Sequence, residues 1–76
     1  MYKIIVDIAY NNKKEYNNYI AKLAKKGIEV KVIKEFGPGG NWPEVELKGN
    51  KQILEKIVCQ LMDDKNYFND FAIKIN

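Results

Sequence analysis

The side chains that most often do acid–base or nucleophilic chemistry are absent from this 76-residue chain. It contains no His, Ser, Thr or Arg, so no side chain has an ordinary pKa near neutrality and no hydroxyl nucleophile of the usual kind is present. It also lacks the guanidinium fork that binds phosphate or carboxylate with two hydrogen bonds. Catalysis would have to rest on Asp, Glu, Lys, Tyr and one Cys. We therefore predict that the protein is not an enzyme.

The cysteine and three aspartates near the C-terminus are the remaining candidates for reactive or metal-binding chemistry. Cys59 lies opposite Ile57 on a predicted helix, so we expect it to be partly exposed, but no histidine can activate its thiol. Asp63, Asp64 and Asp70 lack the spacing of a calcium loop, so we interpret them as parts of a solvated turn. We expect no metal site and no cofactor. A lone cysteine also excludes an internal disulfide, which is typical of a reducing compartment.

A stretch rich in glycine and proline, FGPGGNWPE, occupies residues 36–44 and contains the only tryptophan. A phosphate-binding loop needs its glycines at a helix N-terminus, but a strand is predicted to follow this stretch. The glycines therefore favour a hairpin turn with Phe36 and Trp42 paired across its base. The alternative is a stiff recognition loop that presents Trp42, because tryptophan is enriched at binding hot spots. The contact residues of such a loop would be Gly39, Gly40, Asn41 and Trp42.

The second candidate surface is the basic side of the predicted first helix. All thirteen positive charges of the chain are lysines, and the net charge is +3. Four lysines are predicted to lie opposite the apolar stripe of this helix, namely Lys14, Lys22, Lys25 and Lys26. Such a surface can contact a nucleic-acid backbone or an acidic protein surface. The alternative is an ordinary solvated helix face.

Hydrophobic periodicity indicates the elements that position these residues. Alternating apolar and polar residues predict strands at 2–8, 28–36, 44–48 and 71–75. Apolar residues at helical spacing predict helices at 13–26 and 51–62. Asn12 and Asn50 are suited to cap the two helices, and Gly27 stands where a left-handed C-cap residue is expected. Residues 63–70 are expected to form a loop, with Tyr67 and Phe68 over an edge of the core.

The same periodicity predicts which side chains face the core. On three strands the inward residues would be Ile28, Val30, Val32, Val45, Leu47, Phe71, Ile73 and Ile75. On the second helix they would be Ile53, Leu54, Ile57 and Leu61, with Val58 beside them. The opposite face of the sheet would show Lys3, Ile5, Asp7, Lys31, Ile33, Glu44, Glu46 and Lys74.

The predicted order of elements, β-α-β-β-α-β, resembles the ferredoxin-like split βαβ sandwich. We therefore predict an α+β fold in which residues 1–76 form a single domain. Right-handed crossovers would place both helices on one face of a four-stranded antiparallel sheet with strand order 4-1-3-2. RNA-recognition domains of this architecture stack bases on aromatic residues of the open face. No aromatic residue is expected on the open face of the two central strands here, so Ile5 and Ile33 would instead be available to another chain.

The stretch FGPGGNWPEVELKGNKQILEKI, residues 36–57, is similar to short proteins encoded by bacteriophages. This resemblance implies a phage or mobile-element protein, and small proteins of that origin often inhibit a bacterial defence, as anti-CRISPR proteins do. Its net charge of +3 departs from the acidic DNA mimics among them. Contact with a host protein or a ribonucleoprotein complex is therefore the mechanism we expect.

Three classes of function follow from the sequence. The leading prediction is a non-catalytic inhibitor that acts by surface contact. The alternatives are an accessory protein that binds nucleic acid through its lysines and a ferredoxin-like regulatory domain, which would place its ligand at the interface of a homodimer. No apolar run approaches the roughly 20 residues of a membrane span. We accordingly expect a soluble protein of the bacterial host cytoplasm with no membrane partner.

Overall fold

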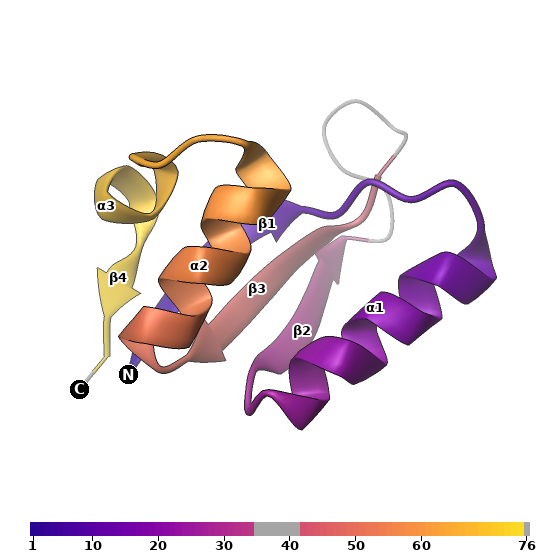
Figure 1. The fold of residues 1–76 in the computed structure, drawn as a ribbon, viewed down its shortest axis with the longest axis horizontal. Helices are drawn as coiled ribbons and strands as arrows, with labels where there is room; N and C mark the ends of the chain where they lie inside the picture. The colour runs from indigo at the N-terminus through magenta and orange to yellow at the C-terminus, as the bar shows by residue number, and fades with distance from the viewer. Residues whose placement is uncertain (35–41, 76) are drawn as a thin grey trace.

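The computed structural model describes residues 1–34 and 42–75, which form a sheet of four strands with helices on one side (Figure 1). The strands are β1 (Tyr2–Asp7), β2 (Glu29–Lys34), β3 (Glu44–Gly49) and β4 (Ile73–Lys74). The helices are α1 (Lys13–Lys25), α2 (Lys51–Met62) and α3 (Tyr67–Phe71). Every strand pair is antiparallel, and the order across the sheet is β2-β3-β1-β4. The predicted ferredoxin-like α+β fold and its strand order are confirmed.

Local signals determine where the two long helices begin and end. The Asn12 side chain accepts a hydrogen bond from the backbone N–H of Glu15 at 2.8 Å, and the Asn50 side chain accepts one from Gln52 at 2.9 Å. Each asparagine thereby satisfies an N–H group that has no partner within the helix. Gly27 follows α1 with a φ of +84°, a conformation that glycine adopts without steric cost. Both predicted N-caps and the predicted left-handed glycine are therefore confirmed.

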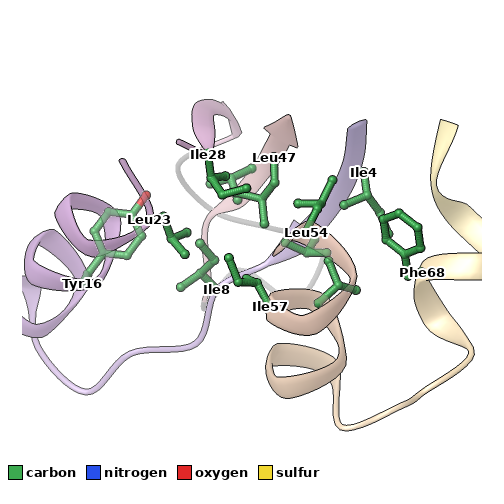
Figure 2. Close-up of a cluster of buried hydrophobic side chains, with 12 residues drawn as sticks. Ile4, Ile8, Tyr16, Leu23, Ile28, Leu47, Leu54, Ile57 and Phe68 are labelled. Atoms are coloured by element: carbon green, nitrogen blue, oxygen red, sulfur yellow. The ribbon is translucent and has the colours of Figure 1, made fainter. Parts of the chain in front are cut away.

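A core made only of apolar and tyrosine side chains holds the helices to the sheet (Figure 2). Val45 and Leu47 of β3 are fully buried, as are Leu54 and Val58 of α2. Ile8, Leu23 and other side chains from β1, α1 and α2 converge between the two long helices and the sheet. No polar or charged side chain of the described residues is buried.

The second strand differs from its prediction at its end. Ile28 is buried and Val30 is half-buried, but Val32 is 50% exposed although it pairs with the buried Val45. β2 is an edge strand, and its register with β3 shifts between Val32 and Lys34. The assignment of Val32 to the core was wrong because an edge strand is covered by a neighbour on one side only. The last two residues of the predicted strand lie outside the described residues.

The buried side of α2 is rotated relative to its prediction. Leu54, Ile57 and Val58 form it, whereas Ile53 is 38% exposed and Leu61 is half-buried. The assignment of Ile53 to the core was wrong. Periodicity alone defines an apolar stripe on a helix, but the position of the neighbouring helix decides which margin of that stripe stays uncovered.

The C-terminal region differs most from its prediction. Residues 67–71 form α3 rather than loop and strand, and β4 is only two residues long. Phe68 is buried and packs against Tyr2, with ring centroids 5.6 Å apart, so its predicted place over the core edge is confirmed. Phe71 and Ile73 are 59% and 57% exposed instead of buried.

The phase of the last strand explains this error. Ile73 lies directly opposite Lys3 and therefore shares the open face of the sheet, while Lys74 lies opposite Tyr2 on the helix side. The alternation was read from Phe71, which belongs to α3, and a shift of one residue moves every side chain of a strand to the other face. Beyond β4, the N–H of Ile75 donates to the carbonyl of Met1 at 3.0 Å.

Gly49 supplies a test of packing between β3 and the start of β2. It is buried, and a Cβ added to it would lie 2.5 Å from Cδ1 of Ile28. We expect Gly49→Ala to lower the free energy of unfolding by about 1 to 3 kcal/mol, as overpacking does. Ile28→Val alone should cost about 1 kcal/mol.

Ile28→Val removes the methyl group that the new Cβ would meet. The free energy of unfolding of Gly49→Ala/Ile28→Val should therefore exceed the value expected from adding the two single effects, by about 0.5 kcal/mol or more. Urea unfolding followed by circular dichroism measures these values. Ile8→Val, which lies beyond the other end of β1, is the matched control and should add to Gly49→Ala without coupling. Equal coupling for both pairs would refute the proposed contact.

Candidate binding surfaces

A groove of about 490 Å³ lies between α1 and α2 on the helix side of the molecule. We call it the lysine groove, and its lining residues are Lys22, Lys26, Gln52, Ile53, Lys56, Ile57 and Gln60. Ile53 is the exposed apolar residue among them, and three lysines line the same groove. The groove therefore combines a small apolar surface with positive charge.

The sheet order explains why this groove exists. α1 packs over β2 at one edge of the sheet, while α2 packs over β1 and β3 (Figure 1). Lys22 of α1 and Lys26, the C-cap residue of this helix, are four residues apart, which places them on the same side of the helix end. On α2, Lys56 lies between Ile53 and Ile57 along the chain. The two walls of the groove are therefore held by the core contacts of two independent helices.

The structure separates the four predicted surface lysines into two pairs. All four are exposed, as the helix pattern predicts. Lys22 and Lys26 line the groove, but Lys14 and Lys25 do not. Lys14 precedes Lys22 by eight residues, which is about 12 Å along a helix. Sequence reasoning missed Lys56, because its neighbour Ile53 had been assigned to the core.

The charge of the helix layer is strongly one-sided. Seven lysines are contributed by α1, its C-cap and α2: Lys13, Lys14, Lys22, Lys25, Lys26, Lys51 and Lys56. Only Glu15 and Glu55 oppose them there. A surface of one sign attracts partners of the other and accelerates their encounter. The charge of this layer favours the approach of acidic molecules over basic ones.

A row of aromatic rings anchors Trp42 at the start of β3. Its ring lies 5.7 Å from that of Tyr10 in an edge-on arrangement, and Tyr10 lies 5.0 Å from Tyr16. The ammonium of Lys13 stands 5.1 Å from the Tyr16 ring centroid. Trp42 is 39% exposed, so it is held by Tyr10 on one side and presents the other to solvent. Of its predicted surroundings, Phe36, Gly39, Gly40 and Asn41 lie outside the described residues.

The cysteine and the aspartates near the C-terminus are the other residues that the sequence analysis considered for reactive or metal-binding chemistry. Cys59 is partly exposed, as predicted. The Asp64 carboxylate accepts a hydrogen bond from the N–H of Asn66 at 2.9 Å, and Asp63 ends α2 in a left-handed conformation. Within residues 1–34 and 42–75, no three acidic or cysteine side chains gather as a metal site would require. No helix in the same ranges has the length and apolar character needed to cross a bilayer.

Comparison with known proteins leaves the chain without a family. No family model, no curated protein and no solved structure matches it. A function must therefore be inferred from the surfaces themselves, and the lysine groove is the one that joins a cavity to a charge preference.

The aromatic row predicts an intermediate effect for Trp42→Ala. We expect a loss of about 1 to 2 kcal/mol in the free energy of unfolding, above the roughly 0.5 kcal/mol of a surface site and below the 3 kcal/mol or more of a core aromatic. Trp42→Ala and Tyr10→Ala should couple by about 1 kcal/mol in a double-mutant cycle, the scale of an aromatic pair. Phe71→Ala, on α3, serves as the uncoupled control. Additivity of Trp42→Ala with Tyr10→Ala would contradict the described contact.

The buried Tyr16 and the half-buried Tyr19 predict how stability depends on alkaline pH. Burial raises the pKa of the Tyr16 phenol, with a further increase from the neighbouring Tyr10, and burial also raises the pKa of Tyr19. The folded state therefore disfavours the phenolate. The resulting contribution to stability is fully present below the ordinary tyrosine pKa of about 10 and is lost as pH rises through the raised values.

We expect the free energy of unfolding to fall more steeply above about pH 10 in the unmodified protein than in Tyr16→Phe/Tyr19→Phe. Urea titrations at several pH values between about 8 and 11.5 would measure both slopes. Comparing the two proteins at neutral pH removes the effect of the lost hydroxyl groups. Identical slopes above pH 10 would show that these two phenols do not ionise differently in the folded state.

Proposed function

We propose that the protein is a non-catalytic binding module that takes an acidic segment of a partner protein into the lysine groove. The supporting observation is the placement of three lysines and the exposed Ile53 in one groove of about 490 Å³. That volume lies within the range of about 300 to 1,000 Å³ that is usual for binding pockets. A partner segment that fits this groove needs one or two apolar side chains to contact Ile53 and acidic residues beside them.

An amphipathic acidic helix meets these requirements. Its apolar residues would contact Ile53 and Ile57, and its acidic flanks would approach Lys22 and Lys26 on one side and Lys56 on the other. Exposed ion pairs each contribute at most about 1 kcal/mol, so the apolar contact would supply much of the affinity. The lysines would set the orientation and the rate of encounter.

Nucleic-acid binding through the same helix layer is the competing function. A phosphate backbone gains nothing from contact with the apolar Ile53. Its electrostatic attraction would extend over all seven lysines of the helix layer, including Lys14 and Lys25. The two functions therefore differ in the side chains on which they depend. Groove binding requires Ile53 and the groove lysines, whereas phosphate binding requires only positive charge.

The wider biological setting stays a prediction. A phage-encoded inhibitor that contacts a host protein or a ribonucleoprotein complex would be one use of such a module, and a regulatory domain would be another. The groove proposal does not depend on which setting applies, because it concerns the chemistry of the bound segment.

A designed probe peptide tests the proposal. The probe is a fluorescein-labelled helical peptide of about 16 residues with leucines at i, i+4, i+7 and i+11 and glutamates at most other positions. A second peptide carries glutamine in place of each leucine, and a labelled single-stranded DNA supplies negative charge without an apolar face. Fluorescence anisotropy measures the dissociation constant of each probe at low and moderate salt.

We expect Lys22→Glu/Lys26→Glu to weaken binding of the leucine peptide at least about tenfold, equivalent to 1.4 kcal/mol. Lys14→Glu/Lys25→Glu is the matched control, with the same change of net charge on the same helix, and should weaken it less than about threefold. Ile53→Gln should weaken the leucine peptide but not the DNA. Equal losses for both lysine pairs would reject groove binding, and tighter binding of DNA than of either peptide would favour the competing function.

A further inference from the structure

The side of the sheet away from the long helices presents its side chains in a regular layout. Register places its residues in three rows that run across β2, β3 and β1. The first row is Glu29, Lys48 and Lys3, extended on β4 by Ile73; the middle row is Lys31, Glu46 and Ile5; the last row is Lys34, Glu44 and Asp7. We call these ten residues the open face. They correct the predicted set in three ways: Ile73 replaces Lys74; Lys34 takes the row position predicted for Ile33, which lies unpaired in the register shift of β2; and Glu29 and Lys48 had been left out.

The charges of the open face are reversed from one end of the strands to the other. On β1, Lys3 stands at one end and Asp7 at the other. On β3, the corresponding residues are Lys48 and Glu44, and on β2 they are Glu29 and Lys34. On each of these three strands, the two ends therefore carry opposite charges. Four lysines and four acidic residues leave the face without net charge, in contrast to the helix layer.

An apolar patch lies at the β1 end of the middle row. Ile5 is 47% exposed on a central strand, and Phe71 and Ile73 are more exposed still. Together with Tyr67, they line a cavity of about 280 Å³, which Lys3 and Glu46 border. The Tyr67 hydroxyl donates to the Ile5 carbonyl at 3.4 Å, which holds its ring beside this strand. Large apolar side chains gathered on an open sheet face are typical of a contact surface.

We propose that the open face binds a second copy of this chain, face to face, about a two-fold axis that runs along the middle row. Such an axis keeps each strand over its own copy and reverses the strand direction. It therefore places the first row of one copy on the last row of the other. Lys3 then meets Asp7 of the partner subunit, Lys48 meets the partner's Glu44, and Glu29 meets the partner's Lys34.

The same axis brings the apolar patches together. Ile5 lies in the middle row, so it faces Ile5 of the partner subunit, with Phe71 close by in both copies. Lys31 and Glu46 also lie on the axis, so each faces its own counterpart, and the opposite charge that each can reach lies diagonally, one strand away across β2 and β3. Packed sheets lie about 10 Å apart and rotate by about 30°, and long charged side chains can span that spacing around an apolar centre. A two-fold contact of this kind requires a self-complementary surface, which the reversed charges provide.

Charge also argues for a second copy over an acidic or basic partner. A partner of one sign would be repelled by half of the open face. A second copy matches it and keeps the two positive helix layers on the outer sides of the dimer. The lysine grooves stay accessible there, so dimerisation neither requires nor prevents the function proposed above.

A charge swap within the open face tests this arrangement. Lys3→Glu would place a negative charge against Asp7 of the partner subunit, at two symmetry-related positions of the interface. Asp7→Lys would place a positive charge against the partner's Lys3 at the same two positions. Lys3→Glu/Asp7→Lys restores opposite charges at both. Lys65→Glu is the matched control, because it makes the same change of charge at an exposed position outside the open face. Sedimentation equilibrium over about 10 to 500 µM protein gives each dissociation constant, and circular dichroism verifies folding.

We expect the unmodified chain to dimerise in this range and each single reversal to weaken the dimer at least about tenfold. The dissociation constant of the Lys3→Glu/Asp7→Lys dimer should return to within about threefold of that of the unmodified chain. The dissociation constant of Lys65→Glu should also stay within this range. Ile5→Asp should abolish the dimer while Lys22→Glu/Lys26→Glu leaves it intact. A chain that remains monomeric at every concentration, or a swap that fails to rescue the folded single variants, would overturn the proposal.

Discussion

The antiparallel register between β1 and β3 is the constraint on which the rest of the structure depends. It sets Ile4 against Leu47 and Val6 against Val45, so that four apolar side chains form one continuous surface for α2. A slip of one residue would turn all of them to the solvent and bring charged side chains under the helix. Because no polar side chain of the described residues is buried, no hydrogen bond between buried side chains helps to define this core. The alternation itself and the fit of the apolar side chains specify it.

That register also creates two surfaces of different character. Each residue that points away from α2 belongs to the open face, where β3 pairs opposite charges with β2 but like charges with β1. The helices carry the excess of lysine on the other side. One layer is therefore attractive to acidic partners, and the other is balanced. The two layers therefore differ in charge and are separated by the thickness of the core.

The sequence was most informative where a residue acts on its immediate neighbours. Asn12, Asn50 and Gly27 act within one turn of a helix, so their roles could be predicted from chain order alone. The errors at Val32 and Ile53 have a different origin, since each is apolar in the correct phase but lies at a margin that no other element covers. Their exposure depends on the placement of distant segments. Among the candidate site residues, the exposure of the lysines was predicted, but their division by the groove was not, because it depends on the distance between two helices.

Both borders of the sheet are unsuited to lateral growth. β2 carries a register shift near its end as well as Lys31 and Lys34, and β4 offers only two residues for pairing. Bulges, lysines and short strands are the features by which sheet proteins avoid edge-to-edge aggregation. A chain built in this way resists joining into extended ribbons or amyloid-like fibrils through its strand edges.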